Sequence, residues 1–342
     1  MRDHGAMTTT PERDDLSVTL ADVAAKSGCS VSLVSRVLAG KRHASPDTRD
    51  RILAAAHDLG YDRAAQRRGR PRSVPRLLDL AMSQWDDPWA NTVVTSVRRA
   101  AAAANYDLVL TPESESMVDD WPSRARARGS AGVVVCLIRP NVSQLDILAS
   151  ANIPVALLDP RAEPARSLPS VGSTDWQGGF DAGRHLARRG TRRFLIITGR
   201  PKYRFGRARE AGFRAAVERH ADGATVEEIS SPWSSESAFV SVRKLLRQGG
   251  LPIGVFSCND EMAYGVYRAA EELQLRIPDD IRVVGFDDLP QSRLMPPPMT
   301  TVRQPMRAMA ARAVQLVLEA EPGTDPGDRA EFPTELIVRA SS

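Results

Sequence analysis

The stretch VTLADVAAKSGCSVSLVSRVLAGKRHASPDTRDRILAAAHDLG, residues 18–60, carries the clearest structural pattern of the chain. Its apolar residues recur at helical spacing in three short blocks, which polar or glycine-containing turns separate. Thr19 and Asp22 resemble a capping box at the first helix, although glutamate or glutamine is the usual partner. Gly28 can adopt the left-handed conformation of a tight turn, and Ser30 can cap the second helix. Two short helices around such a turn, supported by a third, are typical of a helix-turn-helix unit.

The same stretch resembles the headpiece of the lac repressor/gal repressor family of bacterial transcription regulators. The resemblance is carried by TLADVAAKSGCSVSLVSRVLAG and SPDTRDRILAAAHDLGY. It implies that residues 30–38 form a recognition helix, which lies in the major groove of DNA. The residues that it places at the DNA are Thr19, Ser30, Val31, Ser32, Ser35 and Arg36.

Arg36 is the candidate with the most specific chemistry. It can offer two donors to guanine, a contact worth roughly 1–3 kcal/mol of discrimination. The alternatives are that Arg36 touches only a phosphate, or that the three helices form a protein-binding module. The excess positive charge favours DNA, because residues 1–75 hold 13 Lys and Arg against 9 Asp and Glu, whereas residues 76–342 hold 33 of each. A phosphate backbone attracts such an excess.

The size and composition of the chain limit the other possibilities. Its 342 residues suit two or three domains, and an apolar content of 42% allows full cores. Three widely separated cysteines show no metal-ligand spacing and are expected to be buried free thiols. No run approaches the 18 apolar residues of a membrane span, and residues 1–17 do not resemble a signal peptide. We therefore expect a cytoplasmic protein with a disordered leader, no cofactor, no metal and no membrane partner.

Residues 62–76, DRAAQRRGRPRSVPR, form a basic linker. Relatives in the resembled family usually continue here with a pattern like NxxARxL, a hinge helix whose leucine wedges between base pairs in the minor groove. Arg70 takes the place of that leucine, and Gly69 and Pro71 argue against a helix. The run resembles the core of an AT-hook, so we expect Arg68 to Pro71 to form an extended minor-groove arm. The alternative is a solvated basic linker that touches phosphates only.

Beyond residue 76, strand-length apolar runs alternate with helical patterns. This alternation predicts parallel sheets covered on both faces, which bind ligands beyond the carboxyl ends of their strands. The region also resembles the family's effector domain, which is built like a type I periplasmic sugar-binding protein. The segments that carry this resemblance are IPVALLDP (153–160), LPSVGSTDWQGG (168–179), RAREAGFRAAV (207–217), CNDEMAYGV (258–266), IPDDIRVVGFDDLP (277–290) and PPPMTTVRQP (296–305).

The predicted fold is therefore α+β multidomain, with a small all-α helix-turn-helix headpiece and a two-lobed α/β domain like a type I periplasmic-binding protein. The expected parts are a leader at 1–17, the headpiece at 18–61, the linker at 62–76, and an effector-binding and dimerisation domain at 77–342. The resemblance implies a first lobe at about 76–168 plus a return near 303–323. The second lobe would take 169–300 and the C-terminal strand.

Polar and aromatic residues that follow predicted strands form the candidate effector site. A sugar needs planar polar groups for its hydroxyl pairs and an aromatic face for its C–H surface. The candidates are Trp89, Asp159, Arg209, Trp233, Asn259 and Asp287. The resemblance puts Arg209, in RxxGF, at the family's effector-binding arginine, and puts Trp233 and Trp89 where relatives have aromatics. The alternatives are a helix-capping Asp287, a surface pair of Arg209 with Glu210, and a Trp233 that only fills the lobe interface.

Together these features predict a sequence-specific transcriptional regulator, with repressor the favoured reading. It would bind a roughly palindromic operator as a homodimer under the control of a small-molecule effector between the lobes. A sugar is the favoured effector, while a nucleoside, a purine or no effector stays open. The C-terminal EFPTELIVRASS has no heptad segment, which favours a dimer over a tetramer.

An enzyme and a free sugar-binding protein are the more distant alternatives. The chain has no GxGxxG after a strand, no Walker loop and no GxSxG, and its five histidines are scattered. The headpiece argues against a free sugar carrier. We therefore do not expect an enzyme.

Overall fold

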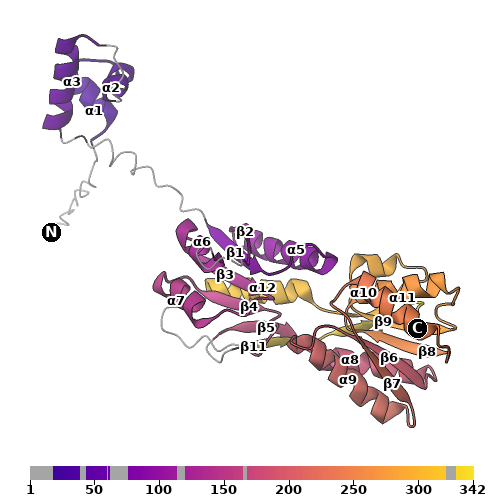
Figure 1. The fold of residues 1–342 in the computed structure, drawn as a ribbon. Coiled ribbons are helices and arrows are strands. Elements are labelled where there is room, and N and C mark those ends of the chain that lie inside the picture. Colours follow the sequence, from indigo (N-terminus) through magenta and orange to yellow (C-terminus); the bar gives the residue numbers. More distant parts are fainter. Residues whose placement is uncertain are drawn as a thin grey trace, which may run out of the picture. The chain divides into compact units, whose positions relative to one another are not determined.

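The computed structural model describes residues 18–38, 44–59, 61, 76–113, 120–164, 168–320 and 329–342. It divides into two compact units, Met1–Val74 and Pro75–Ser342 (Figure 1). The prediction for Arg68, Gly69, Arg70 and Pro71 falls outside the described residues.

Three helices form the described part of the first unit, as expected: α1 (Leu20–Ser27), α2 (Val31–Leu38) and α3 (Pro46–Asp58). The capping box is complete, because the Thr19 N–H donates to Asp22 Oδ2 at 2.7 Å and the Asp22 N–H donates to Thr19 Oγ1 at 3.3 Å. Gly28 ends α1 with a φ of 66°. Each helix contributes to one buried core, which includes Val23, Val34 and Ile52.

The second unit contains two six-stranded sheets within its described residues. The first sheet has the order β11-β5-β4-β3-β1-β2 and is built from β1 (Leu77–Met82), β2 (Asp107–Pro112), β3 (Gly132–Cys136), β4 (Val155–Leu158), β5 (Ser170–Ser173) and β11 (Arg329–Phe332). The second has the order β12-β10-β9-β8-β6-β7 and is built from β6 (Arg193–Thr198), β7 (Thr225–Ser230), β8 (Ile253–Ser257), β9 (Ile281–Asp287), β10 (Thr300–Arg303) and β12 (Glu335–Ile337). The described pairs are parallel apart from β10 with β12, so the predicted parallel sheets are confirmed.

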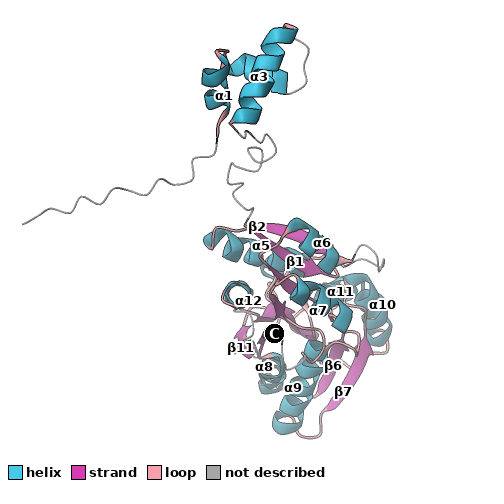
Figure 2. Cartoon of the chain, turned by 90° about the vertical axis from the view of Figure 1, so that its left-hand side faces the viewer, coloured by secondary structure: helices cyan, strands magenta, loops and turns pink. Residues whose placement is uncertain are grey.

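Helices cover the sheets and complete the two lobes (Figure 2). The first lobe has α5 (Pro88–Ala103), α6 (Trp121–Arg128), α7 (Val142–Ser150) and α12 (Met306–Leu318), and the second has α8 (Asp175–Arg188), α9 (Arg204–His220), α10 (Ser235–Leu246) and α11 (Asp260–Glu272). Neighbouring β1 residues face opposite cores, because Leu80 packs with α5 and α12 whereas Ala81 packs with α6 and α7. Both faces of the first sheet are therefore buried.

The boundary between the lobes differs from the expected one. We expected the second lobe to begin at residue 169, but β5 pairs with β4 and β11 in the first sheet. The sequence of β5, SVGS, is short and lacks an apolar run, so it gave no strand signal. The chain therefore crosses between lobes after β5, after β10 and after β11, at residues 174, 304–305 and 333–334.

Two of these crossings are tied together by threonines. The Thr334 N–H donates to Thr174 Oγ1 at 3.0 Å, and the Thr334 hydroxyl donates to the Thr174 carbonyl at 3.2 Å. The Thr174 N–H donates to the Phe332 carbonyl at 2.9 Å. The first and third crossings therefore form one hydrogen-bonded unit.

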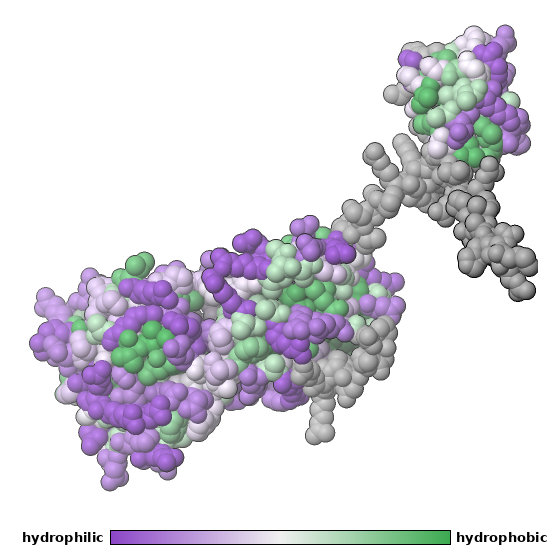
Figure 3. All heavy atoms as spheres, turned by 180° about the vertical axis from the view of Figure 1, so that it is seen from behind, coloured by the Kyte–Doolittle hydropathy of each residue, from purple (hydrophilic) through white to green (hydrophobic). Residues whose placement is uncertain are grey.

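The surface of the two-lobed unit, seen from behind, is mostly hydrophilic with small apolar patches (Figure 3). Among its described residues, the exposed large apolar side chains lie on separate helices, strands and loops: Leu110, Val142, Trp176, Val240, Leu294 and Val338. Among the described helices, none combines the length and apolar character needed to cross a membrane.

Candidate functional site

One cavity brings together all six residues that the sequence predicts for effector binding: Trp89, Asp159, Arg209, Trp233, Asn259 and Asp287. It lies between the lobes, since Trp89 and Asp159 belong to the first and the other four to the second. The sequence prediction missed five further lining residues: Gln84, Asp87, Leu137, Tyr203 and Phe205. The co-location supports the predicted site, and a contact between these side chains and an effector stays a prediction.

Four of the lining residues hold backbone conformations that are unusual for side-chain-bearing residues. The φ angles of Leu137, Asp159, Trp233 and Asp287 are 57°, 47°, 63° and 118°. Such left-handed conformations cost on the order of 1–3 kcal/mol each and cluster at functional sites. Each of the four ends or follows a strand, so the strain lies where parallel sheets present their ligand-binding edge.

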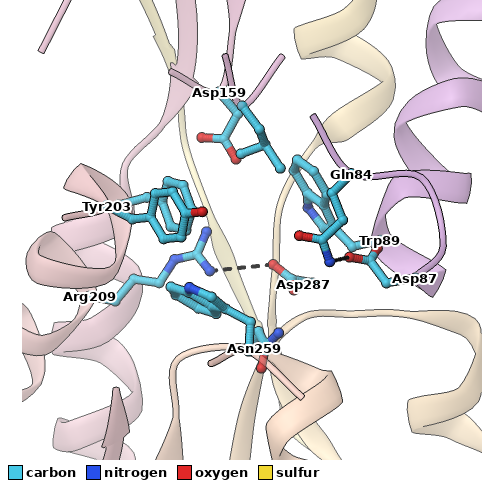
Figure 4. Close-up of a pocket in the computed structure, with 11 residues that line it drawn as sticks. Gln84, Asp87, Trp89, Asp159, Tyr203, Arg209, Asn259 and Asp287 are labelled. Atoms are coloured by element: carbon cyan, nitrogen blue, oxygen red, sulfur yellow. Dashed lines mark hydrogen bonds and ion pairs between the residues drawn. The ribbon is translucent and has the colours of Figure 1, made fainter. Parts of the chain in front are cut away.

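Arg209 on α9 is the centre of the polar side of the cavity. Its guanidinium is buried, and its Nε donates to Asp175 Oδ1 at 2.9 Å while Nη1 donates to the Cys258 carbonyl at 2.7 Å. Nη1 also lies 3.6 Å from Asp287 Oδ1, and Figure 4 shows Arg209 pointing at that carboxylate. The guanidinium carbon of Arg209, Cζ, lies 3.7 Å from the centroid of the Phe286 ring. Arg209 therefore contacts the start of α8, the residue after β8 and the end of β9 on one side of the cavity.

The surface pairing offered as an alternative for Arg209 is not what the structure has. Glu210 instead accepts from Arg214 at 2.8 Å on the exposed side of α9. Asp175, which binds Arg209, was not identified from the sequence. It lies directly after the first crossing and opens α8, a position that only the tertiary structure brings next to α9.

Buried carboxylates outnumber the buried cation here. Burial and, to a smaller extent, the nearby Asp175 charge raise the pKa of Asp159 to about 7, against the opposing effect of Arg209. Burial also raises the pKa of Asp175 and of Asp287. Asp159 Oδ1 and Asp287 Oδ1 are buried without a hydrogen-bond partner among the described residues. Because an unpaired buried oxygen is unfavourable, a ligand that completes hydrogen bonds at these two oxygens suits this site.

An aromatic cluster forms the other side of the cavity. Tyr203 and Phe205 stack with centroids 5.4 Å apart, and Trp233 lies 5.3 Å from Phe205. Gly199 makes room for the indole, because a Cβ there would lie 1.8 Å from Trp233 Cζ2. Trp89 faces the cavity from the first lobe, where its Nε1 donates to Gln304 Oε1 at 3.3 Å. Trp233 packs on Phe205 and Gly199 within its own lobe, and it also lines the cavity.

Two candidates also have structural roles. Asn259 caps α11, since its Oδ1 accepts from the Met262 N–H at 2.9 Å. Asp287 has no such role in the segment that follows, because the short helix η1 (Pro290–Arg293) begins after Leu289 without a side-chain cap.

The cavity is too small for a typical ligand in this arrangement of the lobes. Its volume is about 50 Å³. Pockets for small molecules usually measure ~300–1,000 Å³. A ligand can therefore bind only if the lobes separate or the lining side chains move.

Most of the predicted DNA-facing residues of the headpiece lie on or beside α2, whereas Thr19 is the exposed N-cap of α1. Val31 is 47% exposed, and Ser32 and Arg36 are also exposed. Ser30 caps the helix, with its Oγ accepting from the Leu33 N–H at 3.3 Å, whereas Ser35 is only half-buried. Arg36 Nε donates to the carbonyl one turn back at 3.2 Å, so the side chain lies along the exposed face of the helix. This face can meet a DNA groove.

Among the described residues, no group of three or more His, Cys, Asp or Glu side chains is arranged to hold a metal ion. Cys29, Cys136 and Cys258 are free thiols; Cys136 and Cys258 are buried as expected, whereas Cys29 is only partly buried.

Comparison with known proteins agrees with this architecture. Residues 19–63 match the bacterial regulatory proteins of the lacI family, and residues 184–342 match a periplasmic binding protein-like domain. The HTH-type transcriptional repressor PurR of Haemophilus influenzae (strain PittEE) is 29% identical over 336 residues, covering 94% of this chain and 98% of the relative.

Solved structures of similar proteins cover nearly the whole chain. The transcriptional regulator CelR–cellobiose complex has a TM-score of 0.66 at 26% identity, covering 95% of this chain and 100% of that one. The lac repressor dimer bound to operator and the anti-inducer ONPF has a TM-score of 0.67 at 26% identity, covering 95% and 99%. The headpiece at residues 19–63 thus matches the lacI family of bacterial regulatory proteins, and the chain is a DNA-binding transcription regulator with an effector-binding domain.

Proposed function

We propose that this regulator is a homodimeric repressor whose affinity for a roughly palindromic operator is controlled by a small molecule bound between its lobes. The observation that carries the proposal is the interlobe cavity, to which both lobes contribute predicted effector-binding residues. The similarity to a repressor named PurR supports repression, and the similarity to a lac repressor dimer on operator supports the two-fold assembly. The protein acts as a regulator rather than an enzyme, in the cytoplasm.

A neutral sugar is the effector that the cavity chemistry supports best. Its hydroxyls would donate to the unpaired oxygens of Asp159 and Asp287, and its C–H surface would lie on Trp233. The similar CelR structure contains cellobiose. A nucleoside or purine is the second candidate, because the stacked Tyr203 and Phe205 offer a flat aromatic surface. An acidic or phosphorylated ligand is disfavoured by the carboxylate excess.

Effector and operator should influence each other by the same factor. If an effector weakens operator binding, the operator must weaken effector binding equally, because both ligands bias one equilibrium between lobe arrangements. Two-fold symmetry would place the two α2 helices in successive major grooves of a palindrome.

The test is selection of operator sequences from random DNA with the full chain. The selected sites should be palindromic and should bind far more tightly than scrambled DNA at the same salt concentration. Analytical ultracentrifugation should give the mass of two chains. Recovery of no sequence preference would refute the operator proposal, and a four-chain mass in dilute solution would refute the dimer. A thermal-shift panel of neutral sugars, sugar phosphates and nucleosides then assigns the effector class.

A further inference from the structure

Two consecutive aspartates, the last residue of β9 and the one after it, face different parts of the second lobe. Asp287 lines the cavity, and its Oδ1 lies 3.6 Å from Arg209 Nη1 (Figure 4). The Asp288 carboxylate lies outside the cavity lining, where its Oδ2 accepts from Arg303 Nε at 2.8 Å and its Oδ1 accepts from Arg339. The backbone must therefore turn between the two carboxylates.

This turn uses backbone conformations that side-chain-bearing residues rarely adopt. The φ angles of Asp287 and Asp288 are 118° and 52°. Because neither residue is a glycine, contacts around the turn must offset the unfavourable backbone conformation. The position of the Asp287 carboxylate in the cavity therefore depends on those contacts.

Asp260, the first residue of α11, supplies three hydrogen bonds beside the turn. Its side chain is fully buried and does not line the cavity. Its Oδ2 accepts from the Leu289 N–H at 2.8 Å and from the Ser292 hydroxyl at 2.6 Å. Its Oδ1 accepts from the Thr301 hydroxyl on β10 at 2.6 Å. One carboxylate thus joins α11, the segment after β9 and the neighbouring strand.

Two features of β9 and β10 let Asp260 hold the turn itself. Thr301 Oγ1 also accepts from the Asp288 N–H at 3.4 Å, so one hydroxyl links Asp260 to the turn. Gly285 on β9 leaves room for the carboxylate, because a Cβ there would lie 2.2 Å from Asp260 Oδ1. Asp260 therefore constrains the backbone at both residues that follow Asp287.

We propose that Asp260 is a positioning residue for effector binding, which holds the turn in the conformation that directs the Asp287 carboxylate into the cavity. This role rests on the proposed function of the cavity. Asp260 acts on a ligand only through Asp287, because its own side chain is outside the lining. The ligand that it serves carries a hydroxyl for Asp287 Oδ1, the buried oxygen that has no hydrogen-bond partner among the described residues.

The donors around Asp260 make asparagine an adequate replacement and alanine an inadequate one. The Leu289 N–H can only donate, so it needs an oxygen at the place of Asp260 Oδ2. The asparagine side-chain oxygen supplies it, and the asparagine NH2 group can donate to Thr301 Oγ1, because a hydroxyl oxygen also accepts. Alanine leaves the buried Leu289 N–H without an acceptor.

The first measurement is hydrogen–deuterium exchange at the Leu289 amide of the full chain, without DNA or added ligand. Asp260→Ala should raise the exchange rate by about 10- to 100-fold, whereas Asp260→Asn should change it by less than about 3-fold. The Val283 amide on β9, which donates to the Ser341 carbonyl at 2.9 Å, is the internal reference. Unchanged exchange at Leu289, or an equal increase at both amides, would overturn the positioning role.

The second measurement is a calorimetric titration with the neutral sugar that raises the wild-type melting temperature most in the thermal-shift panel. Asp260→Ala should weaken sugar binding by about 10-fold or more, and Asp260→Asn should bind within about 3-fold of wild type. Rescue by asparagine separates the hydrogen bonds of Asp260 from its charge. Equal losses in the two variants, or wild-type affinity in Asp260→Ala, would contradict the proposal.

Asp79→Ala is the matched control for loss of a buried carboxylate. Asp79 on β1 is also fully buried and also accepts from a threonine and a serine hydroxyl, those of Thr111 and Ser130, but it lies in the first lobe and outside the cavity lining. The folded control should bind the sugar with wild-type affinity. A loss equal to that of Asp260→Ala would show only general destabilisation and would overturn the role.

A second variant keeps the test decisive if Asp260→Ala does not fold. Thr301→Val removes the hydroxyl that links Asp260 to Asp288 and should raise exchange at the Asp288 amide relative to Val283. A wild-type chain that binds no sugar would count against the sugar proposal alone, because the exchange measurements use no ligand. Sugar binding by the wild type with unaltered exchange in the folded variants would count against the positioning role alone.

Discussion

Asp287 Oδ1 lies 3.6 Å from Arg209 Nη1, close enough for attraction and too far for a hydrogen bond. The same oxygen has no hydrogen-bond partner among the described residues, although it is buried. A hydroxyl placed at this oxygen would supply the missing hydrogen bond. Arg209 and Asp287 therefore form a polar site in the cavity that still lacks one hydrogen bond. This property sets the expected effect of substitutions at the two residues.

Arg209→Ala should destabilise the protein by about 3–5 kcal/mol, because it leaves Asp175 and Asp287 as buried carboxylates without their cation. Urea unfolding at pH 7 measures this. Arg214→Ala, on the exposed side of the same helix, should cost under about 1 kcal/mol. Equal losses in the two variants would contradict the buried-cation role.

Arg209→Ala should also abolish the response to effector while leaving operator affinity nearly intact, provided the variant is assayed well below its melting temperature. The reason is that Arg209 lines the effector cavity, whereas the predicted DNA contacts lie in the headpiece. Operator titrations with and without effector measure this. Loss of operator binding by a folded variant would show the cavity assignment to be wrong.

Asp159→Asn should flatten the pH dependence of stability. The pKa of Asp159 in the folded chain is about 7 because of burial, above its ordinary 3.8, so the folded state holds the extra proton between these values. Stability therefore falls as pH rises through this window, by at most about 1.4 kcal/mol per pH unit from this group. Asp260, whose pKa is also about 7, contributes in both proteins and cancels in the difference between wild type and variant. Parallel unfolding curves from pH 5 to 7.5 would contradict the expectation.

Trp233→Phe should weaken effector binding by about 10-fold, because buried aromatic anchors dominate binding energy. Calorimetric titration with the sugar found in the thermal-shift panel measures the change. Trp176→Phe is the matched control, since Trp176 is 45% exposed on α8 and outside the lining of the cavity. The control should bind the sugar with wild-type affinity, and a comparable loss in both variants would point to a general structural effect.

Arg36→Ala should lower affinity for the selected operator by about 1–3 kcal/mol and relax the preference at one base pair. Arg49→Ala, an exposed arginine of α3, serves as the comparison. Fluorescence anisotropy with the operator and single-base variants measures both. A uniform loss across all sequences would make Arg36 a phosphate contact.

Arg70→Ala tests the proposed minor-groove arm of the linker, which lies outside the described residues. The variant should lose preference for A·T pairs beside or between the half-sites, because arginine favours the narrow groove of A·T tracts. Titration of operators with A·T or G·C spacers at several salt concentrations distinguishes a minor-groove arm from a linker that contacts only phosphates. Equal weakening of all operators, with the salt slope lowered by about one charge, would leave only a phosphate contact.

Much of the fold was predictable where a local signal exists. The central strands β1, β3, β8 and β9 are apolar runs, and the headpiece helices carry caps that are readable in the sequence. The edge strand β7, TVEEIS, alternates partly buried and exposed residues and has no apolar run, so it was missed. The predicted start of the second lobe, residue 169, was too early because β5 also has no apolar run and was not recognised as a strand of the first lobe.

The cavity was predicted in part because strand ends are recognisable. Asp159, Asn259 and Asp287 follow or end strands that the sequence shows clearly. Tyr203 and Phe205 were missed because they follow a loop and begin a helix whose start has no side-chain cap. Asp175 was missed because its pairing with Arg209 joins residues 34 positions apart, which no local pattern encodes.

Strand β11 gives the first lobe its outermost strand from a distant part of the chain. Its parallel partner β5 ends at Ser173, whereas β11 begins at Arg329. At synthesis rates of about 5–20 residues per second, a ribosome produces β5 roughly 10–30 s before β11. During that interval β5 presents an unpaired edge, which favours pairing between nascent chains. The first lobe therefore matures only after strands β6 to β10 of the second lobe have been synthesised, so chaperone protection matters most in that interval.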